Sequence, residues 1–128
     1  SIEKALKTTA SNTGLQFHIA LNYGSRAEIT RGVRKLCESV RSGTLAPEDI
    51  DEKIISESLY TGAENGSVPD PDLIIRTSGE QRLSNFLLWQ AAYSELAFTD
   101  TLWPDFTPQE FETMVLEFTH RGRRFGGR

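Results

Sequence analysis

Two short apolar runs, each followed directly by a polar turn that contains glycine, constrain the fold of this chain more than any other feature. Residues 15–22 are apolar at most positions and lead into Tyr23-Gly24, while residues 73–75 lead into Arg76 and a loop with Gly79. Runs of this kind predict strands of a sheet that is covered on both faces. Because ligands of such sheets bind beyond the carboxyl ends of the strands, both turns are predicted to lie on one ligand-binding rim.

Helices are predicted around these strands. Ser25 and Glu28 have the spacing of a capping box, which predicts a helix that begins there and stops at Gly43. Thr107 and Glu110 predict a second capping box, with Pro108 at the first helical position. Three further helices are predicted: one whose apolar face begins at Ile2 and which closes near residues 12–14, one over 47–60, and one from a cap at Ser84 through Tyr93. A small strand is predicted over 96–98.

The order strand, helix, helix, strand, helix predicts an α/β fold with a mostly parallel, Rossmann-like sheet flanked by helices. Two principal strands are too few for an independent sheet of this kind. We therefore expect further strands, earlier in sequence, to lie outside these 128 residues, so that the chain forms part of a larger domain.

The composition is that of a soluble globular protein, with 38% hydrophobic and 25% charged residues. No apolar run approaches the roughly 20 residues that cross a bilayer, and the first residues show no signal-peptide pattern. The single Cys37 excludes an internal disulfide and is predicted to be a buried structural thiol on a helix face. With only His18 and His120 and no CxxC or HExxH, a zinc site is not expected.

Charge is distributed unevenly along the chain, whose net charge is −4. Residues 121–128 hold four Arg and no acid, whereas residues 1–120 carry ten basic and 18 acidic side chains. A basic tail can bind nucleic acid, but the acidic remainder of the chain would repel a polyanion. Nucleic acid is therefore not an expected partner.

Residues 72–86 contain side chains suited to a phosphate. The predicted strand brings Arg76 to its end, and Arg82 and Ser84 follow the glycine loop at the predicted start of a helix. Guanidinium groups offer forked, charge-assisted donors, and a helix start offers unpaired N–H groups. On spacing alone, an equally weighted alternative is that both arginines pair with nearby acids on the surface.

Five motifs stand in order along the chain. They are NYGSR at residues 22–26, DLIIRTSGEQRLSNFLLWQ at 72–90, SELAF at 94–98, LWPD at 102–105 and RRFGG at 123–127. Together they resemble the C-terminal half of the cis-prenyltransferases, and most of all the bacterial undecaprenyl diphosphate synthases. The resemblance covers essentially the whole chain and implies that residues 1–128 are the C-terminal part of one such domain.

The resemblance implies a transferase of isoprenoid biosynthesis that elongates an allylic diphosphate with isopentenyl diphosphate units and forms cis double bonds. Farnesyl diphosphate would be the first acceptor, and the long product, undecaprenyl diphosphate, would supply the lipid carrier of peptidoglycan synthesis in the cell wall. The implied partners are these two diphosphates, a second copy of the chain in a homodimer, and transiently a membrane on product release. A cytoplasmic protein with peripheral contact at the inner membrane face is implied.

Carried over by position, the resemblance gives Arg76, Arg82 and Ser84 as binders of the isopentenyl diphosphate head group, with a backbone contact from Leu83. It gives Glu95 as a carboxylate that helps to hold Mg²⁺ on that diphosphate. Read without the resemblance, Glu95 is a solvated acid near the start of an edge strand.

The resemblance also implies that an Arg-x-Gly motif, here Arg124 and Gly126, reaches across the dimer towards the partner's active site. Gln81 stands where some bacterial relatives have a histidine that can assist the metal. Because a neutral amide is a poorer Mg²⁺ ligand than a carboxylate, Gln81 is left out of the predicted metal site.

The chain lacks the aspartate-containing loop that carries the family's catalytic and metal-binding residue, so no catalytic residue is assigned and the isolated chain is expected to be inactive. Two alternatives stay open. One is a non-catalytic partner subunit of a two-component cis-prenyltransferase, and the other is an unrelated anion-binding module.

Overall fold

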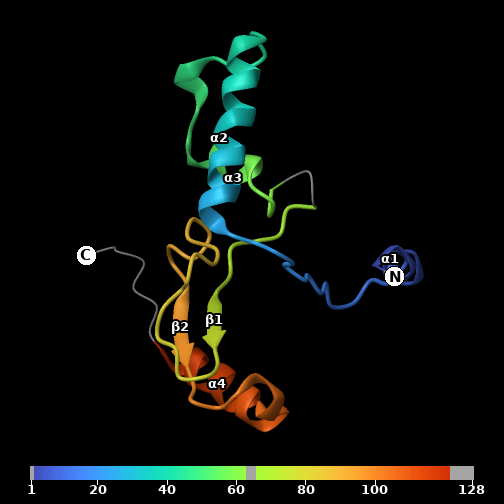
Figure 1. The fold of residues 1–128 in the computed structure, drawn as a ribbon, viewed down its shortest axis with the longest axis vertical. Helices are drawn as coiled ribbons and strands as arrows, with labels where there is room; N and C mark the ends of the chain where they lie inside the picture. Colours follow the sequence, from blue (N-terminus) through green and yellow to red (C-terminus); the bar gives the residue numbers. More distant parts are fainter. Residues whose placement is uncertain (1, 63–65, 122–128) are drawn as a thin grey trace.

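The computed structural model describes residues 2–62 and 66–121. Helices α2 and α3 pack together at one end of the molecule, strands β1 and β2 lie in the middle, and α4 lies beyond the sheet, whereas α1 stands to the side (Figure 1). The helices are α1 Ile2–Thr9, α2 Ser25–Arg41, α3 Glu52–Ser58 and α4 Pro108–His120; the strands are β1 Leu73–Arg76 and β2 Glu95–Phe98; single 3₁₀ turns span Pro47–Asp49 and Trp103–Asp105.

Strands β1 and β2 form a parallel two-stranded sheet, which confirms the predicted α/β class. The register places Leu73 beside Glu95 and Arg76 beside Phe98. The carboxyl ends of both strands therefore meet at the edge that carries Arg76, as expected for parallel strands.

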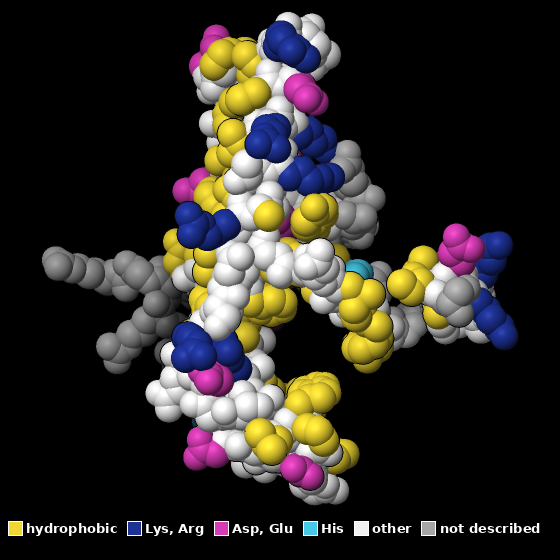
Figure 2. Space-filling view, in the orientation of Figure 1, with side chains coloured by type: hydrophobic (Ala, Val, Ile, Leu, Met, Phe, Trp, Pro, Cys, Tyr) yellow, Lys and Arg dark blue, Asp and Glu magenta, His cyan; other side chains and the backbone are white. Residues whose placement is uncertain are grey.

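The strand predicted over residues 15–22 is not present. Its apolar side chains are exposed, with 94% of Leu15 and 80% of Phe17 accessible to solvent, and Figure 2 shows apolar side chains on the surface beside α1. In the part of the chain that the structure describes, the sheet contains only β1 and β2. The run therefore has strand composition but no neighbouring strand to complete its hydrogen bonds.

The helix predicted from Ser84 through Tyr93 is also absent, and a series of turns takes its place. Ser84, Asn85 and Leu87 have φ angles of 47°, 65° and 46°. L-residues do not continue a right-handed helix through positive φ values, so the local apolar spacing is overridden. Tertiary hydrogen bonds to α2 hold this segment in its turned conformation, as described below.

The two predicted capping boxes have different outcomes. Thr107 is the N-cap of α4, and its Oγ1 accepts from the Glu110 amide at 3.2 Å, as predicted. The Glu110 carboxylate does not complete the box, because it accepts from the Thr99 and Thr101 hydroxyls instead. In α2 the N-cap is Gly24 without a side-chain bond, while Ser25 is already the first helical residue. The prediction for Ser25 and Glu28 was therefore wrong, and both side chains bond to distant parts of the chain.

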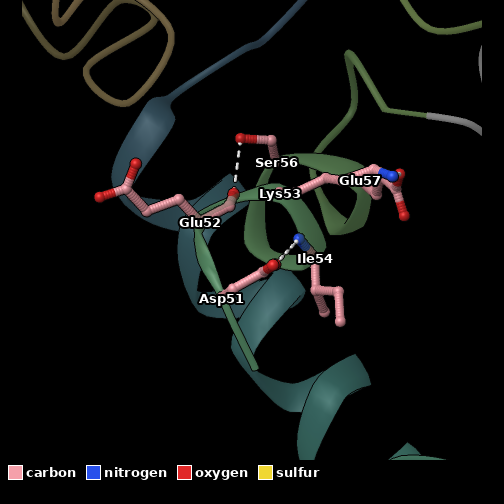
Figure 3. A network of polar contacts seen from close by, with 6 residues as sticks. All are labelled: Asp51, Glu52, Lys53, Ile54, Ser56 and Glu57. Carbon is pink, nitrogen blue, oxygen red and sulfur yellow. Dashed lines mark hydrogen bonds and ion pairs between the residues drawn. The ribbon is translucent and has the colours of Figure 1, made fainter. Parts of the chain in front are cut away.

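The helix predicted over residues 47–60 is divided into a 3₁₀ turn and α3. The division falls at Asp51, whose Oδ1 accepts from the Ile54 amide at 2.8 Å and so begins a new helix (Figure 3). A carboxylate at an N-cap satisfies an amide that has no partner within the helix.

Few apolar side chains are fully buried among the described residues, with Leu59 and Ala97 the buried hydrophobic ones. Cys37 is exposed, which contradicts its prediction as a buried thiol, and Val33 on the same helix is 50% exposed. The amphipathic pattern of α2 was identified correctly, but it indicates burial only where another element covers the apolar face. No helix in the described ranges has the length and apolar character required to span a membrane.

Candidate anion-binding site

The site begins at the end of β1, where Arg76 is the last strand residue. The turn after it is held against the chain that follows β2, because the Gly79 amide donates to the Thr99 carbonyl at 2.9 Å. Gly79 has φ 71°, and an added Cβ would lie 3.0 Å from Asp100 Oδ1. A residue without a side chain fits this left-handed, closely packed position, so the two loops at this edge support each other.

Arg76 closes the next loop back onto the strand end. Its Nη1 donates to Ser84 Oγ at 2.9 Å and also to the backbone carbonyl oxygen of Arg82. The half-buried guanidinium therefore joins residues six and eight positions further along the chain. It still has unused N–H donors, because a guanidinium carries five.

A cavity of about 280 Å³ lies at this place. Its wall includes two arginines and a serine together with aliphatic and aromatic side chains. The lining residues are Ile74, Ile75, Arg76, Arg82, Leu83, Ser84, Phe86 and Phe98.

Arg82 pairs with Glu80, whose Oε2 lies 2.6 Å from the Arg82 Nη1. The side chains are 68% and 38% exposed, respectively, so water weakens this pair. Exposed pairs contribute about 0–1 kcal/mol, whereas an arginine can bind phosphate oxygens through two parallel bonds. A phosphate group can therefore replace Glu80 as the partner of Arg82.

The structure brings Arg76, Arg82, Leu83 and Ser84 together, as the sequence suggested. Glu95 is not with them. It is the first residue of β2, three positions before the edge at Arg76 and Phe98, or roughly 10 Å along the strand. Its Oε2 lies 3.4 Å from Arg121 Nη1. The predicted dimer-crossing residues Arg124 and Gly126 lie outside the described residues.

Behind the cavity loop lies a polar network that the sequence analysis missed. Glu28 is completely buried; its Oε1 accepts from the Tyr60 amide at 2.7 Å and from Gln90 Nε2 at 3.3 Å, and its Oε2 accepts from the Tyr23 hydroxyl. Burial, together with the hydrogen bond to Glu28, raises the pKa of Tyr23 to about 12. The phenol is thus protonated through neutral and mildly basic pH, where it donates to Glu28.

The network could not be found from local spacing, because its members are far apart in sequence. Gln90 and Glu28 are 62 positions apart, and Tyr60 and Glu28 are 32 positions apart. In the sequence, Glu28 is recognisable only as a glutamate three residues after Ser25, and this spacing predicts a capping box rather than a buried network.

Known proteins are similar to this chain along almost its whole length. A family model described as "Putative undecaprenyl diphosphate synthase" matches residues 1–126. The chain belongs to this family. A curated isoprenyl transferase from Geobacillus kaustophilus is 57% identical over 127 residues, which are 99% of this chain and 48% of that protein. One from Bacillus subtilis is 54% identical over 99% of this chain and 47% of that protein.

Solved structures show the same fold. Lavandulyl diphosphate synthase from Lavandula x intermedia, in complex with dimethylallyl diphosphate, has a TM-score of 0.92 and 40% identity, over 98% of this chain and 52% of that one. A probable undecaprenyl diphosphate synthase from Campylobacter jejuni has a TM-score of 0.78 and 33% identity, and the match covers 98% of this chain and 54% of that one. The chain thus spans about half the length of the relatives it matches. The predicted family and fold class are confirmed.

Proposed function

We propose that this chain provides the isopentenyl diphosphate half of an enzyme that elongates polyprenyl chains with cis double bonds. The observation that carries the proposal is the Arg76–Ser84 contact of 2.9 Å at a cavity that Arg82 also lines. Membership of the prenyltransferase family supports the reaction class. Farnesyl diphosphate as the first acceptor, and undecaprenyl diphosphate for the cell-wall lipid carrier as the product, belong to the same proposal.

The composition of the cavity suits a substrate with a charged head and an apolar tail. A diphosphate carries several negative charges, and burying them without partners would be prohibitive. Arg76 and Arg82 supply positive charge and N–H donors, while Ile74, Phe86 and other apolar side chains offer contacts to a five-carbon hydrocarbon. The work of such a site is to position the substrate and to stabilise charge.

The described residues do not form a magnesium site by themselves. Glu80 pairs with Arg82, Glu95 lies at the other end of the strand pair beside Arg121, and no group of three or more His, Cys, Asp and Glu gathers in residues 2–62 and 66–121. Mg²⁺ on a diphosphate needs only one or two carboxylates. We propose that Glu95 is one of them, as the family resemblance implies, and that another carboxylate comes from outside the described residues.

Homodimer formation and transient membrane contact are likewise proposals. They follow from the family resemblance of the Arg124–Gly126 segment and from the long lipid product. The alternative, a non-catalytic partner subunit, would also pair with another chain. A cavity with both arginines and the serine in place favours direct substrate binding by this chain.

Replacing Arg82 with Ala in a full-length protein carrying this chain is expected to weaken binding of isopentenyl diphosphate about 10-fold to 100-fold. Each charge-assisted hydrogen bond contributes about 1.5–3 kcal/mol, and 1.4 kcal/mol corresponds to a factor of ten. Isothermal titration with isopentenyl diphosphate measures the change. Arg41→Ala, at the exposed end of α2, is the control and should bind like the unmodified protein. Equal binding by Arg82→Ala would contradict the assignment.

The 128-residue chain alone is expected not to form polyprenyl product. Large side chains such as Leu15 and Phe17 are uncovered, and the relatives are about twice as long. The measurement is incorporation of labelled isopentenyl diphosphate by the purified chain, with the full-length protein as positive control. Long-chain product from the chain alone would refute this expectation.

A further inference from the structure

We propose that Asn85 is a positioning residue for the diphosphate site, because it caps α2 from the loop that presents Ser84. This inference rests on the proposed function and deepens it. Gly24, the N-cap of α2, has no side chain to bond the first amides of the helix. Asn85 Oδ1 instead accepts from the Arg26 amide at 2.9 Å, and the Asn85 carbonyl accepts from the Ser25 amide at 2.8 Å.

Amides in the first turn of a helix have no partner within the helix, so these two bonds satisfy donors that would otherwise need water. The residue that supplies the cap lies 59 positions away in sequence from Arg26. The cap therefore joins two separate parts of the fold, the start of α2 and the cavity loop.

A third bond fastens the other end of the loop. The completely buried Ser25 accepts at its Oγ from the Leu88 amide at 3.0 Å. Gly24 permits the close approach, because a Cβ at this position would lie 2.8 Å from Asn85 Nδ2. Residues 85–88 are thus fixed to α2 at both ends.

The α2 cap affects the cavity through Ser84, the residue before Asn85. Ser84 and Asn85 have φ angles of 47° and 65°, and two left-handed residues in succession reverse the chain sharply. Asn adopts this conformation more readily than most residues. The reversal directs Ser84 Oγ towards Arg76, which donates to it at 2.9 Å. The cavity wall is formed by other side chains, so Asn85 acts through Ser84.

The test is Asn85→Gly in a full-length protein that carries this chain. Glycine keeps the left-handed backbone available and removes the capping amide. Without the hydrogen bond to the Arg26 amide, Ser84 is held less firmly towards Arg76, and the KM and Kd for isopentenyl diphosphate are expected to rise about 5-fold. The KM for the allylic diphosphate should stay unchanged. Asn85→Asp keeps an acceptor and adds a negative charge at a helix N-terminus, so its thermal midpoint should match that of the unmodified protein, although the added charge lies beside the diphosphate.

Asp51→Gly is the matched control. Asp51 is the N-cap of α3, and its Oδ1 accepts from the Ile54 amide at 2.8 Å (Figure 3). Asp51 does not line the cavity, so this variant removes a helix cap away from the site. It should lower the thermal midpoint without changing isopentenyl diphosphate binding. If Asn85→Gly behaves like Asp51→Gly, with a lower thermal midpoint and unchanged isopentenyl diphosphate binding, the positioning role is overturned.

Gly24→Ala offers a second variant should Asn85→Gly fail to fold. Its methyl group would displace the Asn85 amide from the opposite side, and the same rise in KM for isopentenyl diphosphate is expected. An unchanged KM would overturn the positioning role. If the unmodified protein fails to bind isopentenyl diphosphate, the proposed function fails with it, whereas equal binding by the unmodified and Asn85→Gly proteins removes only the role of Asn85.

Discussion

Glu28→Ala is expected to lower the free energy of unfolding of a full-length protein carrying this chain by about 3–4 kcal/mol. The carboxylate is completely buried and accepts from the Tyr60 amide at 2.7 Å and from the Tyr23 hydroxyl. Hydrogen bonds to charged groups contribute about 1.5–3 kcal/mol each, and their loss leaves buried donors without partners. Urea unfolding followed by circular dichroism measures the change.

Two further variants separate the causes. Tyr23→Phe removes one donor and keeps the ring, which packs edge-on against Phe86 at 5.7 Å, so a loss of about 1–2 kcal/mol is expected. Glu28→Gln keeps the shape and one acceptor and should fall between Tyr23→Phe and Glu28→Ala. A Glu28→Ala protein as stable as the unmodified one would show that water or a rearranged Gln90 satisfies these donors.

The start of α4 was predicted correctly, because the bond that decides it is local. Thr107 and Glu110 are three residues apart and form the predicted cap, at 3.2 Å. Ser25 and Glu28 have the same spacing, but their side chains bond to Leu88 and Tyr60 instead. A capping pattern reports which bonds are possible within one turn, and it carries no information about competitors from elsewhere in the fold.

The two wrong elements have a common physical cause. Residues 15–22 have the composition of a strand but no neighbouring strand among the described residues. Residues 84–93 have apolar spacing, but positive φ angles at Ser84 and Asn85, held by α2, interrupt a helix. In both cases the outcome depends on contacts with the rest of the fold, which local composition and spacing do not report.

The candidate site, like the fold, was predictable where its residues are close in sequence and not where they depend on strand pairing. Arg76, Arg82 and Ser84 lie within nine residues and follow a strand end, so one turn of chain suffices to gather them. The position of Glu95 depends on the register of β2 against β1, which pairs it with Leu73 rather than with Arg76. A shift of three residues in register would change which end of the strand a side chain occupies, and the sequence alone does not fix this shift.

Arg76→Ala is expected to have the largest effect on substrate binding, weakening the affinity for isopentenyl diphosphate about 100-fold or more. The variant loses charge-assisted bonds to the diphosphate and also the 2.9 Å bond that holds Ser84 at the cavity. Arg76→Lys keeps the charge but not the forked donors and should give an intermediate loss. The measurement is isothermal titration with isopentenyl diphosphate, with Arg41→Ala as the control on α2.

A double-mutant cycle decides whether Arg76 and Ser84 act together. If Arg76 both binds the diphosphate and orients Ser84, the serine is already misplaced in Arg76→Ala, so adding Ser84→Ala should weaken binding little further. Interacting neighbours show coupling of about 0.5–3 kcal/mol, whereas independent sites are additive. Ser84→Ala and Arg76→Ala effects that simply add would show that the contact between them does not assemble the site, and that each side chain meets the diphosphate independently.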